Sequence, residues 1–229
     1  MTTSKKDRDR LVINDKILKQ AIGWIAISLP FVLWAGARLL CCDGLQRSIS
    51  AYYYTVMGDY FVGALCAIGL LLFSYNGYDH IDFYLGKAAG LFALGVALLP
   101  STPESVDKEI PKYLIECVKD YVDMIGYLHF GSAAIFLSLL AIFSYFRFTK
   151  TDPEKKIEIT AEKRNRNIIY KTCGVVIWIS LILIAIVFWK ELDERSYQPV
   201  FILESIAVVS FSISWLVKGG FLLKDPNKG

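Results

Sequence analysis

The chain has 229 residues, a hydrophobic content of 55% and a formal net charge of +3. Its long uncharged runs exclude an ordinary soluble domain, because about 20 consecutive apolar residues span the roughly 30 Å of hydrocarbon in a bilayer. Its Lys and Arg residues gather in the loops, where they act as topology signals, so we expect no nucleic-acid partner. The sequence therefore predicts one integral membrane domain covering residues 1–229.

Apolar segments predict an all-α fold, a polytopic bundle of six transmembrane helices. In chain order the helices cover Ala21 to Leu40, Tyr53 to Tyr75, Phe83 to Pro100, Met124 to Phe146, Thr172 to Trp189 and Pro199 to Lys218. Within the first segment, Pro30 predicts a kink and not an end, because apolar residues continue beyond it. The small residues at 35–37 resemble a signal cleavage site, but the acidic residues upstream favour a retained anchor.

The third segment is the shortest, and Lys87 must extend to the interface if this helix is to span the membrane. Small residues recur along it at spacings of three or four. They are Gly86, Gly90, Ala93 and Ala97. This pattern predicts a face on which a neighbouring helix packs closely.

The loop charges predict the orientation. With the N-terminus inside, most Lys and Arg residues fall on the cytoplasmic side, in the tail 1–20 and the basic loop 147–171. The outer loop 101–123 then lies on the opposite side, where acidic residues offset its few lysines. We therefore expect both termini to be cytoplasmic.

The outer loop carries a candidate disulfide. Cys117 falls on the apolar face of a predicted interfacial helix that begins near Pro111. If that side is oxidising, Cys117 can pair with Cys41 or Cys42, and the alternative is three unpaired thiols. The spacing of the cysteines and histidines indicates no zinc fold.

Three ionisable residues interrupt the apolar segments near the same membrane face: Asp59, His129 and Glu204. Such residues are costly in hydrocarbon without partners, so we expect them to meet inside the bundle. Asp59 also belongs to a polar or small stripe predicted to face protein. The stripe is Tyr52, Thr55, Asp59, Gly63 and Cys66.

Ser50, Arg38 and Arg47 lie close to the same face and complete the candidate polar site. One imidazole and two carboxylates can ligate a divalent metal, so Asp59, His129 and Glu204 are also candidate ligands, although no cofactor is identified from the sequence. A hydrogen-bonded cluster that only locks the helices together is an equal alternative.

The order of several motifs resembles a known family. The motifs are Ser48-Ile49-Ser50, Phe61-Val62-Gly63, Leu99-Pro100 and Leu128-His129. Together they resemble a bacterial membrane family of unknown function, related to the autophagy-modulator and GPI-lipid-remodelling membrane proteins. The resemblance implies a six-helix bundle in the bacterial inner membrane, with a polar site near Ser50, Asp59 and His129 that serves lipid recognition.

Three function classes follow from the sequence. A lipid-binding or lipid-modifying protein would use membrane lipids as partners, with an anionic headgroup near Arg38 and Arg47. A transporter or channel for small solutes or ions would need a continuous polar route, which the apolar inner halves of the fourth and fifth segments disfavour. A structural or partner-binding membrane protein would need neither a bound lipid nor a polar route. The residues of the candidate polar site are therefore compatible with ligand binding, with catalysis or with holding the helices together.

Overall fold

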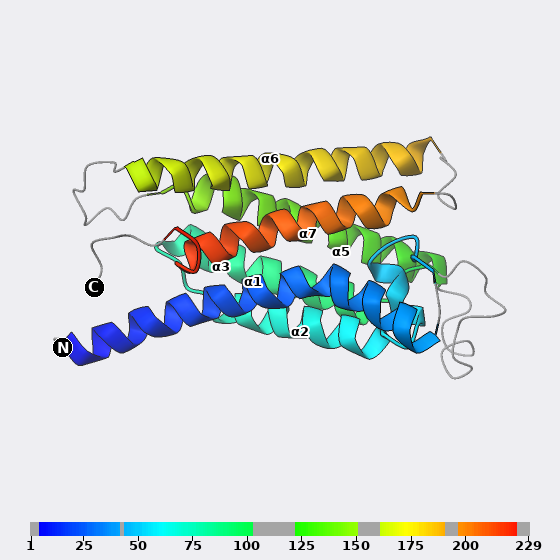
Figure 1. Cartoon of the computed structure of the whole chain (residues 1–229), viewed down its shortest axis with the longest axis horizontal. Coiled ribbons are helices and arrows are strands. Elements are labelled where there is room, and N and C mark those ends of the chain that lie inside the picture. The colour runs from blue at the N-terminus through cyan, green and yellow to red at the C-terminus, as the bar shows by residue number, and fades with distance from the viewer. Residues whose placement is uncertain (1–4, 42–43, 103–121, 151–160, 191–196, 224–229) are drawn as a thin grey trace.

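A computed structural model describes residues 5–41, 44–102, 122–150, 161–190 and 197–223. Within these ranges the side chains of residues 5–14, 41, 122 and 123 are not described. The elements are α1 (Lys5–Cys41), η1 (Ser50–Tyr54), α2 (Gly58–Ser74), α3 (His80–Leu98), α5 (Val122–Ile142), η2 (Phe143–Arg147), α6 (Ala161–Trp189) and α7 (Pro199–Lys218) (Figure 1). The all-helical fold expected from the sequence is confirmed for these residues.

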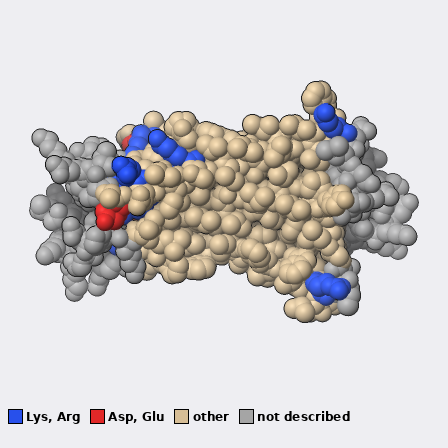
Figure 2. All heavy atoms as spheres, turned by 45° about the horizontal axis from the view of Figure 1, so that its top comes forward, with Lys and Arg blue, Asp and Glu red and all other residues tan. Residues whose placement is uncertain are grey.

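The lengths and surfaces of the helices fit a membrane. Five helical segments are long and apolar enough to cross a bilayer, namely those in α1, α3, α5 with η2, α6 and α7. The sixth, α2, has 17 residues and so measures about 25 Å. Figure 2 shows a face whose middle carries no charged side chain, while Lys and Arg lie toward both ends and Asp and Glu toward one of them. The chain is therefore a multi-pass integral membrane protein.

The helices pack in a ring. Their main contacts follow the order α1, α2, α3, α5, α6, α7 and back to α1. In Figure 1 the bundle is elongated, with α6 forming an outer layer over α5 and α7. One end holds η1, where α1 ends and α7 begins, and we call it the Ser50 end. The other holds η2, where α1 begins and α7 ends, and we call it the Arg147 end.

Two helices are longer than the sequence analysis predicted. Both α1 and α6 extend past their apolar segments at the Arg147 end, because polar residues there continue the helical backbone beyond the hydrocarbon length. The last helix has the predicted bounds, Pro199–Lys218, and α1 continues through Pro30 as expected.

The predicted second helix is divided in two. Residues 50–54 form the 3₁₀ turn η1, and α2 begins only at Gly58, because Thr55 has extended backbone angles of φ −105° and ψ 176°. This break changes the helical phase, so the predicted protein-facing stripe does not exist: Asp59 and Gly63 are exposed. The buried face of α2 is apolar instead, and it includes Phe61, Leu65 and Ile68.

The small face predicted for the third segment is confirmed. Gly86, Gly90, Ala93 and Ala97 are all buried on α3, which packs extensively against α2. A Cβ atom added to Gly90 would lie 2.7 Å from the carbonyl oxygen of Gly69 on α2. Lys87 extends its amine to the carbonyl oxygen of Phe73 and lies over the ring of Phe83, so the chain accommodates this charge close to a helix end.

Several predictions fall on residues outside the described ranges. These are the interfacial helix near Pro111 and the pairing of Cys117 with Cys41 or Cys42, for which no side chains are described. Cys66 and Cys173, which are described, are free thiols. The orientation of the bundle in the membrane stays a prediction.

Candidate functional site

At the Ser50 end, α7 holds the segment that leads into η1. The Phe201 N–H donates to the Arg47 carbonyl oxygen at 2.9 Å, and the Ile49 N–H donates to Glu204 Oε2 at 2.6 Å. The Tyr54 hydroxyl also donates to the Ser101 carbonyl oxygen just beyond α3. These bonds satisfy polar backbone groups of a non-helical segment, as the interior of a membrane protein requires.

His129 and Ser50 form a buried pair, with exposed fractions of 1% and 6%. His129 Nε2 lies 2.9 Å from Ser50 Oγ, and His129 Nδ1 lies 2.7 Å from the Leu99 carbonyl oxygen. Because a carbonyl oxygen can only accept, Nδ1 carries a proton, and in the neutral ring Nε2 then accepts from the Ser50 hydroxyl. An imidazole that accepts from an alcohol has the arrangement of a general base beside a nucleophile.

A cavity of about 60 Å³ that is partly open to the surface of the bundle lies beside this pair. Its walls come from α1, α2, α3, α5, α7 and the residues at the start of η1, whereas α6 contributes none. Ser50 and Glu204 are the polar lining residues. The others are Ala26, Leu29, Ile49, Phe61, Leu65, Ile68, Val96, Ala133, Phe136, Leu137, Leu140, Val208 and Phe211.

Beyond Phe211, the bundle is filled by aromatic side chains. Phe211 contacts Trp215, whose ring also packs against Tyr75 and Phe143, with centroid distances of 5.3 to 5.9 Å. Trp215, Tyr75 and Phe143 are at most 1% exposed, and we call these three residues with Phe211 the aromatic plug. Phe211 also lines the cavity, so the aromatic plug begins where the cavity lining ends along α7.

The other sequence-predicted site residues lie away from the pair. Asp59 is exposed in the first turn of α2, where the helix dipole stabilises a carboxylate. No hydrogen bond links Asp59 to His129. Arg38 is exposed in the last turn of α1, and Arg47 is half-buried. The structure therefore brings together Ser50, His129 and Glu204. Among the described residues, no group of three His, Cys, Asp or Glu side chains is placed to hold a metal ion.

The Arg147 end contains a second polar cluster that the sequence analysis missed. Arg147 is 6% exposed, and its Nε and Nη2 donate to Asp82 and Asp79. Asp82, which is fully buried, also accepts from the Tyr78 N–H at 2.9 Å, and Lys150 lies 3.3 Å from Asp79. The N–H of Asp82 and the guanidinium of Arg147 lower the pKa of the Asp79 carboxyl.

A π-helical turn places Arg147 in this cluster. In η2 the backbone bonds skip one more residue than in an α-helix, as the 2.9 Å bond from the Phe148 N–H to the Phe143 carbonyl oxygen shows. The wider turn buries Phe143, Arg147 and Phe148 together. From the sequence, Arg147 was placed only in the basic loop 147–171, and the signal for the cluster was an acidic residue and a basic residue at the ends of two predicted helices.

No family model, curated protein or solved structure matches the chain. The resemblance drawn from the sequence motifs therefore stays a prediction.

Proposed function

We propose that this membrane protein binds a single-chain lipid at the Ser50 end, with the chain in the cavity and a head group that carries hydroxyl or ammonium donors. The observation that carries the proposal is an apolar cavity, inside a membrane bundle, whose polar lining consists of Ser50 and Glu204. Sites for small ligands have this composition: an apolar wall with a few polar groups that fix orientation.

The cavity has the dimensions of an acyl-chain segment. From Glu204 to Phe211 on α7, and from Ala133 to Leu140 on α5, its lining extends over seven residues, or about 10 Å. A volume of about 60 Å³ gives room for roughly four to six water-sized groups. Each methylene buried against this apolar wall contributes about 0.8 kcal/mol, so a hydrocarbon chain is the favoured occupant.

The polar lining selects the head group. The Ser50 hydroxyl donates to His129, so its oxygen keeps acceptor capacity, and the Glu204 carboxylate accepts only. A head group with hydroxyl or ammonium hydrogens complements these acceptors. A phosphate would instead meet a like charge at Glu204, so the site differs from the anionic-headgroup site expected at Arg38 and Arg47.

Photocrosslinking tests this proposal. The probe is a monoacylglycerol with a diazirine in its acyl chain, incubated with the purified protein in detergent micelles. We expect crosslinks on cavity-lining residues, and we expect Ala133→Leu, which fills the cavity, to reduce them about tenfold, the equivalent of about 1.4 kcal/mol. The control is Ala134→Leu, because Ala134 is exposed on the same helix. Equal crosslinking in both variants would contradict the proposal.

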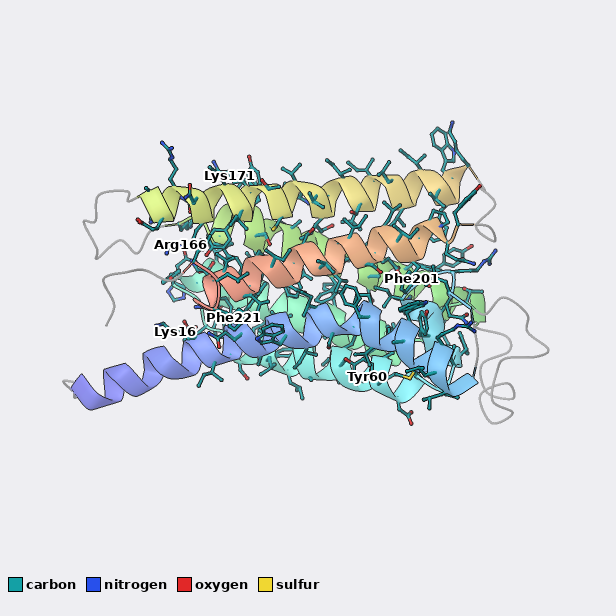
Figure 3. The ribbon with its side chains drawn as sticks, viewed as in Figure 1. Lys16, Tyr60, Arg166, Lys171, Phe201 and Phe221 are labelled. Carbon is teal, nitrogen blue, oxygen red and sulfur yellow. The ribbon has the colours of Figure 1, made fainter. Side chains whose placement is uncertain are left out.

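We also propose that α2 completes six spans and that the Arg147 end faces the cytoplasm of a bacterial inner membrane. Lys16, Arg166 and Lys171 lie at this end (Figure 3), and basic residues favour the cytoplasmic side. In a variant whose natural cysteines are replaced, an impermeant maleimide should label Gly44→Cys in intact cells. It should label Lys150→Cys only after lysis, and the reverse pattern would invert the orientation.

A further inference from the structure

We propose that Ser50 is a nucleophile and His129 its general base, and that the site cleaves the carboxylic ester of a single-chain lipid. The inference rests on the proposed function, because it places the acyl chain of the substrate in the cavity. It goes beyond binding by assigning a reaction to the hydrogen-bonded pair.

The positions of the two side chains suit these roles. Ser50 lines the cavity, whereas His129 does not and lies against Ser50 and the end of α3. A substrate carbonyl at the polar end of the cavity therefore meets the Ser50 oxygen first. The base contacts the same oxygen at 2.9 Å, so it can accept the proton without occupying substrate space.

The Leu99 carbonyl supplies the third part of the arrangement. It lies at the C-cap of α3, where helix carbonyls have no intrahelical partner, and it accepts the Nδ1 proton of His129 at 2.7 Å. This bond fixes the ring tautomer and orientation, which a carboxylate does in a Ser-His-Asp triad. His129 is thereby held with its basic nitrogen toward Ser50.

The reaction balances with water as the second substrate. Ser50 Oγ bonds to the ester carbonyl carbon while His129 Nε2 takes the hydroxyl proton. The bond from the carbonyl carbon to the alkoxy oxygen then breaks, and His129 returns the proton to the departing alcohol. Water next attacks the acyl-Ser50 ester with its proton passing to His129, the Ser50 ester bond breaks, and His129 reprotonates Ser50 as the fatty acid leaves.

Glu204 is suited to bind the alcohol part of the ester. The Ile49 N–H, which immediately precedes Ser50 in the chain, fixes one carboxylate oxygen at 2.6 Å. A carboxylate has about four lone-pair sites and can accept from several donors at once, so a substrate hydroxyl can join the bonds that Glu204 already makes. The substrate class that satisfies both ends of the site is a monoacyl ester of a polyol, with its hydroxyl groups toward Glu204 and its chain toward Phe211.

The cavity beside Ser50 and His129 favours a catalytic role over a hydrogen bond that only joins the helices. Two side chains that only joined helices would be enclosed by packed atoms on every side, as protein interiors generally are. Ser50 instead borders a void that continues toward Phe211. Ser50 is therefore both oriented by a base and part of the cavity wall.

An alkyl fluorophosphonate, which reacts with activated serine, tests the nucleophile. We expect the wild-type protein in micelles to gain one covalent adduct, seen as an intact-mass shift and mapped to Ser50 by peptide sequencing. Ser50→Ala and His129→Gln should each abolish the adduct. Ser48→Ala is the matched control, because Ser48 lies two residues away and accepts from the Ala51 N–H at 3.0 Å.

Wild-type protein that gives no adduct, or an adduct on a different serine, overturns the catalytic inference whatever the variants do. A second measurement is release of oleate from monooleoylglycerol, which should fall at least a hundredfold in Ser50→Ala, because activated nucleophiles depend on their base and cannot be replaced by a methyl group. Lipid crosslinking that depends on Ala133 without an adduct overturns catalysis and leaves the binding proposal standing. An adduct without such crosslinking overturns the binding proposal and the inference built on it.

Discussion

The two ends of the bundle use polar residues in opposite ways. At the Ser50 end, His129, Ser50 and Glu204 make hydrogen bonds beside an apolar cavity. At the Arg147 end, Arg147 and two aspartates make ion pairs, and large aromatic side chains pack close by. The first arrangement leaves space at a reactive group, and the second fills the space around a set of mutually compensated charges.

This difference indicates that the Arg147 end contributes more to the stability of the fold, whereas the Ser50 end carries the reactive groups. A buried ion pair is costly to break, because removing one partner leaves an uncompensated charge in a medium of low dielectric constant. A neutral hydrogen bond contributes only about 0.5–1.5 kcal/mol net, so the Ser50 end can carry a reactive pair without controlling the fold. Variants at the two ends should therefore separate folding from activity.

The largest expected effect is at the Arg147 end. Arg147→Met leaves the buried Asp82 carboxylate without its guanidinium, which should lower the free energy of unfolding by about 3–5 kcal/mol. Unfolding in mixed micelles with increasing dodecyl sulfate would measure it. Arg164→Met, at an exposed position, is the control. If Arg147→Met lowered the free energy of unfolding less than Ser50→Ala does, the Ser50 end would be the more important end for stability.

A smaller effect is expected where α2 and α3 meet. Gly90→Ala places a Cβ atom 2.7 Å from the Gly69 carbonyl oxygen, and overpacking of this kind costs about 1–3 kcal/mol. Gly63→Ala on α2 should cost little of this, because its added Cβ meets nothing within 4 Å. The same unfolding measurement applies, and equal losses in both variants would show that this helix contact is not close.

Ser50→Ala should have a smaller effect on folding than Arg147→Met. It leaves the buried Nε2 of His129 without a donor, so we expect a loss of about 1–3 kcal/mol together with complete loss of fluorophosphonate labelling. Thermal unfolding and intact mass, measured on the same sample, sharpen the comparison. A loss comparable with that of Arg147→Met would indicate that the Ser50 end is a structural brace.

The smallest expected effect is a pH dependence from Asp79. Its pKa is lowered by the Asp82 N–H and then by Arg147, so its stabilising contribution is fully present above the usual Asp pKa of about 3.9. The contribution is lost as the pH falls through the lower folded-state value. Between pH 5 and 8, the stability difference between wild type and Asp79→Asn should stay constant, and it should shrink below about pH 4.

The sequence predicted the helices well because apolar length and composition are local properties. Pro199–Lys218 matches α7 at both ends, with Pro199 at the first turn and Lys218 in the last. The start of α2 could not be predicted in this way. The residues before the break at Thr55 are held by long-range hydrogen bonds, from the Phe201 N–H to the Arg47 carbonyl oxygen and from the Ile49 N–H to Glu204. Ile49 and Glu204 are 155 positions apart in the sequence.

The candidate site was predicted in part for the same reason. The structure places His129, Glu204 and Ser50 at the same end of the bundle, whereas Asp59 is exposed because its face depended on the break before α2. Arg147 and Asp82 were missed because the π-helical turn that buries Arg147 has no local pattern in the residues 143–147. The sequence patterns predicted how far along its helix each residue lies, whereas the packing of the helices determines whether its side chain faces the protein interior.

The aromatic plug also contains a tryptophan, Trp215, whose fluorescence can report on the interior of the bundle. The Trp215 indole is fully buried, and its N–H finds no acceptor among the described residues. Trp24, Trp34 and Trp189 are exposed on the outside of the bundle. Quenchers carried on lipid tails should therefore extinguish the outer tryptophans and spare Trp215, whose blue-shifted emission would report from one helical turn below the cavity floor whenever a ligand enters.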